Sequence, residues 1–383
     1  MLDRDRRPPN PVARMSPQRH ATARRLLVAS LAALLSACQP ASVKIAFIGG
    51  LTGRLSDLAV DGRNGAQMAV DTLNAQDGAG RYQLVVHDDQ QQVEVGRADV
   101  DAAADEGAAF AIGPMTSVMA IPMAAEASRR KIVLISPTAN SDELSGQDDW
   151  FFRVITSARG GAEQLATAAI ARDLRRGAVL MEWRNRAYTQ NFARRFEDRF
   201  QALGGSPLAP VHYESDADPD YAKIAQALLA NKPQLVLLVC GAVDAAIAAQ
   251  QIRRIDPDVR IAMASWSSNV QLLQLGGRAL EGALVLQALD LDSRQPAWLD
   301  FRRRYEARYG TAPGQAAVYG YEAAMLGAEG LRRAGKRPLR DVLREPAEWP
   351  GLQQPVELDR FGDSARQFHL SEVRGGRFVM LPS

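Results

Sequence analysis

The sequence predicts an α/β protein made of two similar units, each a parallel sheet flanked by helices. Apolar stretches of strand length alternate with helical stretches of ten or more residues, which is the pattern of a parallel sheet. The alternation restarts after Trp150–Ile155, and 383 residues are enough for two domains.

In the first unit, each expected strand is a short apolar run and each expected helix carries apolar residues at helical spacing. The run Val43–Gly49 ends in the glycine-rich turn Gly49–Gly53. The expected strands are Val43–Gly49, Gln83–His87, Ala108–Ile112 and Lys131–Ile135, and the expected helices are Gly62–Ala75, Val95–Glu106 and Val118–Arg130.

The second unit repeats the pattern without obvious sequence repetition, and the chain then ends in helices and strands. The expected strands are Arg176–Met181, Leu208–Tyr213, Leu235–Cys240 and Arg260–Ala264, and the expected helices are Gly160–Asp173, Tyr188–Leu203, Asp220–Leu229 and Ala242–Ile255. Two further helices, Trp298–Tyr309 and Ala316–Ala334, precede a tail of strands within Val356–Asp363 and Phe368–Met380.

Two hydroxyl-rich turns in the stretch Ile112–Leu144 are the first candidate site. Gly113–Ser117 and Ser136–Asn140 each follow an expected strand, and a helix beginning near Thr116 or Ser117 separates them. Both turns should therefore lie at the same sheet edge, where parallel sheets bind ligands and a helix N-terminus favours an anion. Alternatively, these side chains only cap and turn the chain.

Residues 1–37 have the composition of a lipoprotein signal peptide. A basic region precedes the apolar run Leu26–Leu35, and small residues lead directly to Cys38. This order predicts an exported protein, periplasmic and held at the membrane by a lipid on Cys38. The alternative is an ordinary signal peptide with an incidental cysteine. The second cysteine, Cys240, is expected in a buried strand.

The charge of the chain gives no sign of a nucleic-acid surface. Residues 1–37 contain seven Arg and two Asp, and the rest of the chain has 39 basic and 42 acidic residues, a net charge of −3. We therefore expect no nucleic-acid partner.

No motif points to catalysis, a cofactor or a metal. The histidines His87, His212 and His369 are scattered, without metal-ligand spacing. The chain has no nucleophile elbow, phosphate-binding loop, dinucleotide fingerprint or CxxC pair. The pair Asp88–Asp89 follows a strand, and a solvated turn with a capping role is favoured over a catalytic one. We expect a protein that is not an enzyme.

A series of short motifs resembles the type I periplasmic binding proteins, specifically the Leu/Ile/Val-type receptors of ABC importers. Each motif is weak alone, but they occur in the family's order over more than three hundred residues. They are Gly49–Gly53, Gly65–Ala75, Asp88–Asp89, Gly113–Pro114 with Ser117, Ser136–Ala139, Asp220–Tyr221, Leu280–Gly282, Tyr319–Ala323 and Phe361–Asp363.

The resemblance implies two Rossmann-like lobes joined by three hinge crossovers, which close over a ligand. The crossovers are expected near residues 156, 287 and 355. The N-terminal lobe would then hold 43–156 and 287–355, and the C-terminal lobe 157–286 and 356–383.

The resemblance also implies a ligand site between the lobes. Ser117 and the N–H groups near Ser117 and Asn140 would hold a ligand carboxylate, and Ala139 would offer its carbonyl to an amino group. Tyr188 matches the second-lobe tyrosine that packs on the ligand.

Departures from the family pattern bear on the identity of the ligand. The acid that neutralises the ligand's ammonium aligns roughly with Ser265, and Leu58 stands at a first-lobe Trp. A buried ammonium without a counter-charge is costly, so the ligand need not be an ordinary α-amino acid. Trp183 and Trp266 could instead stack on a flat or larger ligand, or only pack in the core.

These observations predict a solute-binding lipoprotein of an ABC importer. Its partners would be a small ligand with a carboxylate or amide, an ABC permease and, through the lipid anchor, the membrane; no cofactor is expected. The alternative is a regulatory lipoprotein of the same fold that binds a protein, such as a cell-wall synthase activator or a sensor.

Overall fold

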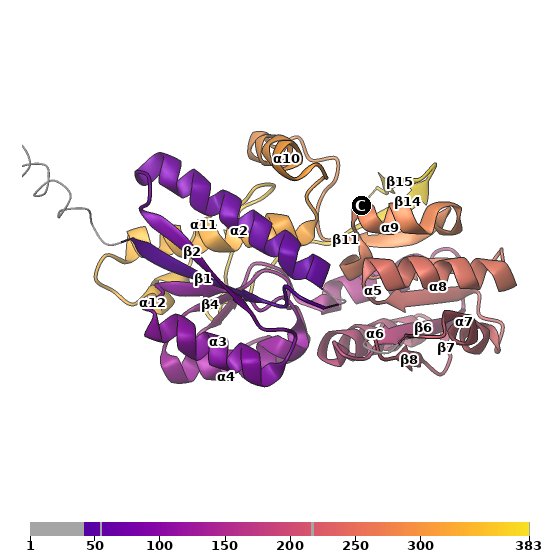
Figure 1. Ribbon diagram of the computed structural model, residues 1–383. Coiled ribbons are helices and arrows are strands. Elements are labelled where there is room, and N and C mark those ends of the chain that lie inside the picture. The colour runs from indigo at the N-terminus through magenta and orange to yellow at the C-terminus, as the bar shows by residue number, and fades with distance from the viewer. Residues whose placement is uncertain (1–41, 54–55, 216–217, 383) are drawn as a thin grey trace, which may run out of the picture. The chain divides into compact units, whose positions relative to one another are not determined.

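The computed structural model describes residues 42–53, 56–215 and 218–382, and it confirms the α/β fold class. Two mainly parallel sheets are each covered by helices (Figure 1). The predicted signal peptide 1–37 and Cys38 lie outside the described residues. No helix in the described part of the chain is long and apolar enough to cross a membrane.

The first sheet is entirely parallel and has the strand order β2-β1-β3-β4-β5. The interior strand β1, second in this order, is almost completely buried because helices cover both faces. The strands are β1 (Val43–Gly49), β2 (Tyr82–Asp88), β3 (Phe110–Ile112), β4 (Leu134–Ser136) and β5 (Phe151–Arg153).

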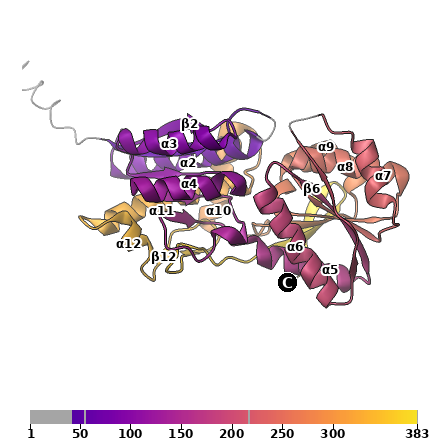
Figure 2. The same cartoon turned by 90° about the horizontal axis from the view of Figure 1, so that it is seen from below.

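Alternate residues of β1 point to opposite faces of the sheet, as the two-residue period of a strand requires. Ile45 and Phe47 pack with one set of helices, while Ala46 and Ile48 pack with the other. Helices α2 (Ser56–Asp77) and α11 (Gln315–Ala334) cover the first face, and α3 (Val93–Asp105) and α4 (Ser117–Arg130) cover the second (Figure 2).

The second sheet has the order β15-β14-β11-β10-β9-β6-β7, with β8 also paired to β6. The strands from β6 to β11 run parallel, and β14 and β15 add an antiparallel edge. The strands are β6 (Arg176–Glu182), β7 (Ser206–Pro207), β8 (Val211–Tyr213), β9 (Leu235–Val239), β10 (Arg260–Met263), β11 (Leu284–Gln287), β14 (His369–Arg374) and β15 (Arg377–Met380).

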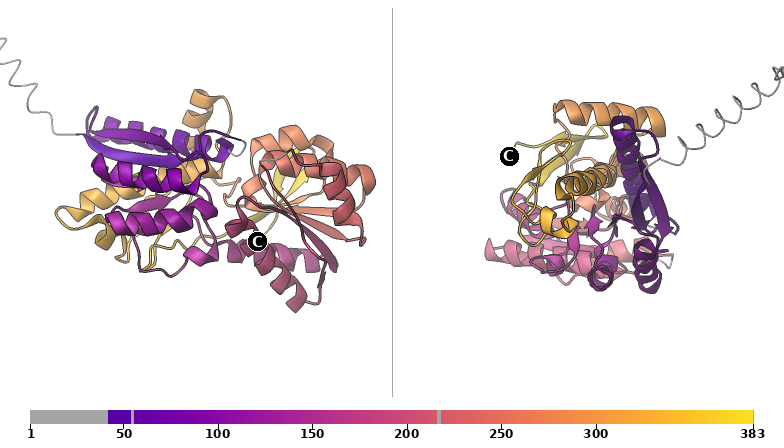
Figure 3. Two further views of the ribbon diagram at one scale, coloured as in Figure 1. Left: turned by 60° about the horizontal axis from the view of Figure 1, so that its bottom comes forward. Right: turned by 90° about the vertical axis from the view of Figure 1, so that its left-hand side faces the viewer.

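Helices also cover both faces of the second sheet, which Figure 3 shows from two further directions. Helices α5 (Ala158–Ile170) and α6 (Arg186–Ala202) pack on one face, and α7 (Tyr221–Leu229) and α8 (Ala242–Ile255) pack on the other. Helix α9 (Val270–Gly276) lies against α8. Cys240 is free and buried, as expected, but it lies directly after β9 and not within the strand.

The chain passes three times between the elements of the two sheets. It leaves β5 for α5, leaves β11 for α10 (Pro296–Tyr309) and α11, and returns from β13 (Val356–Glu357) to β14. Helix α12 (Leu339–Leu343) and strand β12 (Glu348–Trp349), which pairs with β13, precede that return. The boundaries 43–156, 157–286, 287–355 and 356–383 for two lobes remain a prediction.

The predicted start of the first helix at Gly62 is wrong. Helix α2 begins at Ser56 and continues through Gly62 and Gly65. These glycines do not interrupt the helix because they allow close packing on α11. A Cβ at Gly65 would lie 1.9 Å from the carbonyl oxygen of Ala317. The six extra residues bring Asp57, Leu58 and Asp61 onto a helix.

Several other bounds differ from those predicted. The strand expected at Leu208–Tyr213 is divided into β7 and β8, and Pro210, which has no N–H to donate, lies in the gap. Strand β4 begins three residues later than expected because Lys131 is in the left-handed conformation that ends α4. No element was predicted for residues 265–296, which form α9, β11 and two short 3₁₀ segments.

Candidate functional site

The two hydroxyl-rich turns lie side by side, as predicted. Strands β3 and β4, which lead into them, are adjacent and parallel. Gly113 opens the first turn with a φ of 123°, and a Cβ there would lie 2.0 Å from the carbonyl oxygen of Ile48. Only glycine permits this close approach, so the first turn is held against the end of β1.

Two hydroxyls of the second turn fix the first turn in place. The Ser136 hydroxyl donates to the carbonyl of Pro114 at 2.7 Å, and the Thr138 hydroxyl donates to the carbonyl of Met115 at 2.5 Å. Both side chains are buried. Ser136 and Thr138 therefore serve to hold the turns together, which is the alternative role that the sequence left open for these side chains.

Five of the six predicted binding residues meet around one small cavity, the central cavity. Ser117 and Asn140 come from the turns of the first sheet, and Tyr188 comes from α6 of the second. Ser265 and Trp266 come from the 3₁₀ segment after β10. The volume open to water is about 20 Å³, room for little more than one water molecule.

Ala139 does not line the central cavity. It is completely buried, and its N–H donates to the Ser136 hydroxyl at 3.0 Å. Trp183 is not part of the lining either, because its ring lies against His212 with the ring centroids 4.5 Å apart. Of the two tryptophans considered for stacking on a ligand, only Trp266 lines the central cavity.

The N–H groups expected to hold an anion already have protein partners. The backbone N–H groups of Asn140 and Ser141 donate to Ser117 Oγ at 3.2 and 3.1 Å. The N–H of Val118 donates to Asn185 Oδ1 at 3.3 Å. Since Ser117 Oγ already accepts two hydrogen bonds, its own proton is what it can offer to a ligand.

Two buried polar groups at the central cavity have no hydrogen-bond partner among the described residues. The Tyr188 hydroxyl is one, on a side chain that is 4% exposed; burial raises its pKa, against a weaker opposite effect of the Ser265 side chain beside it. The other is Oε1 of Gln315, at the start of α11, where the residue is 9% exposed. An unpaired buried donor or acceptor costs about 1–3 kcal/mol, which a ligand could recover.

A larger cavity of about 420 Å³, the acidic cavity, shares Leu58, Trp266 and Gln315 with the central one. Its lining includes two carboxylates of α2, Asp57 and Asp61. Burial raises the pKa of Asp61 to about 6. Hydrogen bonds from the Tyr305 hydroxyl and the Ala317 N–H act in the opposite direction and lower it, but they do not outweigh the effect of burial. Burial also raises the pKa of Asp57.

These two carboxylates were not among the predicted site residues, because residues 56–61 were expected to lie outside any helix. Two buried acids of the second sheet were not predicted either. Asp244, in the first turn of α8, accepts hydrogen bonds from the Tyr213 and Tyr221 hydroxyls, each at 2.6 Å. Glu182 accepts from the N–H of Asn185 at 2.8 Å and so positions a residue of the central cavity. Nothing in the local pattern marks either acid as buried.

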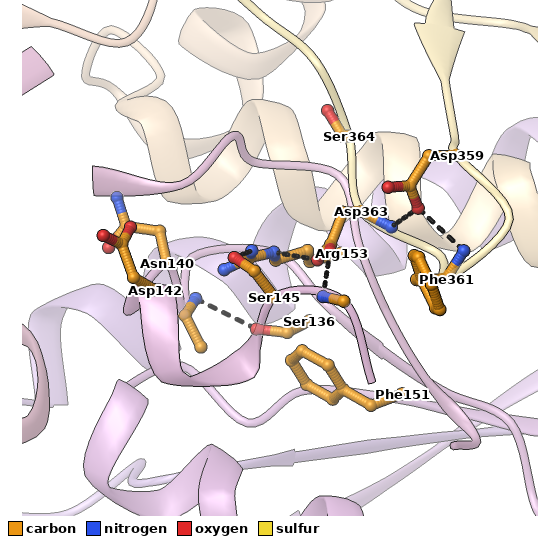
Figure 4. Close-up of polar contacts among 12 residues, drawn as sticks. Ser136, Asn140, Asp142, Ser145, Phe151, Arg153, Asp359, Phe361, Asp363 and Ser364 are labelled. Carbon is orange, nitrogen blue, oxygen red and sulfur yellow. Dashed lines mark hydrogen bonds and ion pairs between the residues drawn. The ribbon is translucent and has the colours of Figure 1, made fainter. Parts of the chain in front are cut away.

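Arg153 holds the segment that follows Asn140 (Figure 4). Its guanidinium is 1% exposed and donates to Asp363 Oδ1 at 2.8 Å, to the Ser141 carbonyl at 2.9 Å and to Ser145 Oγ at 2.6 Å. Arg153 thereby connects the second turn to the returning segment of the chain. The geometry of Asn140 depends on this buried ion pair.

Polar contacts also join the second turn to helices of the second sheet. Asp142 accepts from Arg195 Nε of α6 at 2.7 Å and lies 3.4 Å from Arg159 Nε. The N–H of Asp142 donates to Asn191 Oδ1 at 3.4 Å. These contacts hold the two sides of the central cavity together.

The described residues contain no group of three or more His, Cys, Asp or Glu that could hold a metal ion. The pair Asp88–Asp89 caps its turn, as interpreted, but the expectation that the pair is solvated is wrong for Asp89, which is 1% exposed. Asp88 accepts from the N–H of Leu51 at 2.8 Å, and Asp89 accepts from the N–H of Gln91 at 2.8 Å.

Comparisons with known proteins agree with this architecture. A curated relative, Leu/Ile/Val-binding protein BraC3 of Rhizobium johnstonii, is 24% identical over 366 residues, 92% of this chain and 97% of its own. The substrate-binding protein LivJ of Streptococcus pneumoniae, solved with isoleucine, superposes with a TM-score of 0.80 at 18% identity, over 89% of this chain and all of its own.

A solute-binding protein from Rhodopseudomonas palustris, solved with 3,4-dihydroxybenzoic acid, also has a TM-score of 0.80, at 17% identity, over 89% of this chain and 96% of its own. The model of the family described as periplasmic binding protein matches residues 42–369. The chain therefore belongs to the periplasmic binding protein family, as a type I substrate-binding protein of the branched-chain amino-acid ABC transporter kind and not an enzyme.

Proposed function

We propose that this protein is the lipid-anchored receptor of an ABC importer and closes on a small ligand that bears a carboxylate or amide, such as an amino acid or a derivative. The observation that carries the proposal is the meeting of Ser117 and Asn140 with Tyr188, Ser265 and Trp266 around one cavity. These residues come from both sheets, so a ligand held there would join the two sides.

The names of the related proteins support this ligand class. The curated relative is a Leu/Ile/Val-binding protein, and the two solved structures hold isoleucine and 3,4-dihydroxybenzoic acid. Both ligands carry a carboxylate. In this chain the Ser117 hydroxyl offers a matching donor, and the positive end of the α4 dipole favours the carboxylate's charge.

Closure follows from the proposed division into lobes 43–156 with 287–355 and 157–286 with 356–383. A ligand that contacts both lobes stabilises the arrangement in which they meet. The Asp142–Arg195 contact would form in that arrangement and break on opening. Ala139, which is buried within the second turn, would act through the placement of Asn140.

Lipid attachment at Cys38 is the proposed anchor, supported by the order of the basic, apolar and small residues before it. A single anchored cysteine would hold the receptor beside its permease at the membrane. Replacing Cys38 with Ala should move the protein from the membrane fraction to the soluble periplasmic fraction. Retention in the membrane fraction would contradict the anchor.

Ligand binding is tested by melting the purified protein, residues 39–383, against a panel of amino acids, amides and aromatic carboxylates. A ligand at a hundred times its dissociation constant adds about 2.7 kcal/mol to the free energy of unfolding. We expect at least one compound to raise the melting temperature by several degrees. If none does, the protein is not a receptor for these solutes.

The second candidate function is a regulatory lipoprotein that binds a protein partner. It is favoured by the small volume of the central cavity, about 20 Å³, and by the internal pairing of the N–H groups of Asn140 and Ser141. The same melting panel separates the two functions. Cross-linking in cells should recover a permease for the importer, and a synthase or sensor for the regulator.

A further inference from the structure

We propose that the acidic cavity is a cation subsite, and that the ligand carries an ammonium or guanidinium group which lies beside Asp57, Asp61 and Gln315. This inference rests on the proposed solute-binding function and names a ligand class for it. The other end of the ligand lies in the central cavity, at Ser117 and Tyr188. The ligand is thus a basic amino acid or a closely related amine.

The two cavities adjoin one another. Leu58, Trp266 and Gln315 line both of them, so the two ends of one ligand could lie on either side of these side chains. The volume of about 420 Å³ falls within the range of about 300–1,000 Å³ that ligand pockets occupy. The room for a ligand therefore lies mainly on the acidic side.

Among the described residues, the charged side chains that line the acidic cavity are all carboxylates. Asp57 and Asp61 are the charged side chains in its lining, and no Lys, Arg or His of the described ranges lines it. Asp57 forms no ion pair or side-chain hydrogen bond with the described part of the chain, and its charge is repelled by Asp244 on α8. Burying carboxylates without a counter-charge is costly, and a ligand cation would remove that cost.

Gln315 gives an independent indication of a ligand donor. Its Oε1 is buried, has no partner among the described residues and belongs to the lining of both cavities. An amide oxygen can only accept a hydrogen bond, so the missing partner must be an N–H or O–H group. An ammonium or guanidinium has several such donors and can satisfy Gln315 and a carboxylate together.

The roles of the two carboxylates differ. Asp61 already accepts hydrogen bonds from the Tyr305 hydroxyl and the Ala317 N–H, which fix it between α2, α10 and α11. Asp57, one helical turn earlier, is hydrogen-bonded by backbone N–H groups of α2 and has no side-chain partner among the described residues, so its carboxylate keeps acceptor sites for a ligand. Asp57 is therefore the residue whose removal should discriminate most strongly between cationic and neutral ligands.

The test is calorimetric titration of the purified protein and two variants with L-arginine, L-lysine, L-glutamine, L-leucine and benzoate. Asp57→Asn keeps the size of the side chain and removes its charge. The matched control is Asp71→Asn on the same helix, which removes a solvent-exposed carboxylate paired with Arg308. At 1.5 Å per residue, Asp71 lies about 21 Å further along α2.

We expect L-arginine or L-lysine to bind at least about tenfold more tightly than L-glutamine and L-leucine, and Asp57→Asn to weaken that binding at least about tenfold. Asp71→Asn should leave it unchanged. If L-leucine, L-glutamine or benzoate binds most tightly, or Asp57→Asn binds the cation as wild type does, the cation subsite is refuted while the solute-binding function stands. If none of the five compounds binds and the melting panel also finds no ligand, the proposed function fails and the inference fails with it.

Discussion

Arg153→Ala should destabilise the protein more than any exposed arginine substitution. The side chain is 1% exposed, and its three hydrogen bonds reach Asp363, Ser141 and Ser145. Removing one member of a buried ion pair costs about 3–5 kcal/mol, because the other member keeps its charge without a partner. The truncation also leaves a cavity in a closely packed region, which adds to the cost.

The lower end of this range, about 3 kcal/mol, is expected because the acceptors keep some of their partners. Asp363 is 17% exposed and still accepts from the Gly146 N–H at 2.8 Å. The Ser141 carbonyl still accepts from the Leu144 N–H at 3.3 Å. Of the three acceptors of Arg153, only Ser145 Oγ would keep no other hydrogen bond to the described residues.

The assay is guanidinium-induced unfolding followed by circular dichroism, with Arg159→Ala as the control. Arg159 is 54% exposed and lies 3.4 Å from Asp142, so its loss should cost less than about 1 kcal/mol. The double variant Arg153→Ala with Asp363→Asn removes both charges. It should cost less than the sum of Arg153→Ala and Asp363→Asn measured singly, by about 1–3 kcal/mol. A cost below about 1 kcal/mol for Arg153→Ala, or strict additivity in the double variant, would refute the role of this ion pair.

Three further changes follow from the structure. Gly65→Ala should lower the free energy of unfolding by about 1–3 kcal/mol, because the new Cβ would lie 1.9 Å from the Ala317 carbonyl oxygen. This clash should outweigh the higher helix propensity of alanine. Thermal melting measures the effect, and a stabilised variant would contradict it. Asp89→Asn should raise the stability at pH 7.5 by up to about 3 kcal/mol and by little near pH 4. The reason is that burial raises the pKa of Asp89 from 3.8 to about 6, so the wild type loses stability as the pH rises through that window. Unfolding curves at both pH values measure the difference between the variant and the wild type. A stability gain that does not depend on pH would be inconsistent with this reason. Asp142→Ala removes the contact with Arg195 of α6 and should increase the radius of gyration of the ligand-free protein in solution scattering. An unchanged radius would show that this contact does not hold the two sides of the central cavity together.

The alternation of strands and helices was readable from the sequence because each element buries one face or stripe of apolar residues. The two turns at Gly113–Ser117 and Ser136–Asn140 were readable for a second reason. Parallel strands with a short helix between them must end at the same edge, so the neighbourhood of Ser117 and Asn140 follows from the connectivity. The connectivity explains why Ser117 and Asn140 meet. The family resemblance indicated that Tyr188, Ser265 and Trp266 of the second unit would lie at the same site.

The acidic cavity could not be predicted because it depends on the behaviour of two glycines. In sequence, Gly62 can end a helix or allow close packing, and only the partner helix α11 decides between these roles. Once α2 extends to Ser56, Asp57 and Asp61 face the same cavity as Gln315. That contact joins residues about 250 positions apart and leaves no local pattern.

The internal pairing of the anion donors was equally beyond the sequence. Residue spacing shows that Ser117 and Asn140 can be neighbours, but not that Ser117 Oγ accepts the N–H groups of Asn140 and Ser141. Likewise, Glu182 and Asp244 can be buried because serine and tyrosine hydroxyls donate hydrogen bonds to their carboxylates, and these contacts are not visible in the sequence.

The most direct test of solute binding between the two sheets is the calorimetric affinity of Tyr188→Phe. The Tyr188 hydroxyl is buried and has no partner among the described residues, so its removal should leave the melting temperature of the free protein unchanged or slightly higher. A ligand in the central cavity that accepts from this hydroxyl should bind the variant about tenfold more weakly with the stoichiometry still one to one. Equal affinities for wild type and Tyr188→Phe would place the ligand elsewhere and contradict the account.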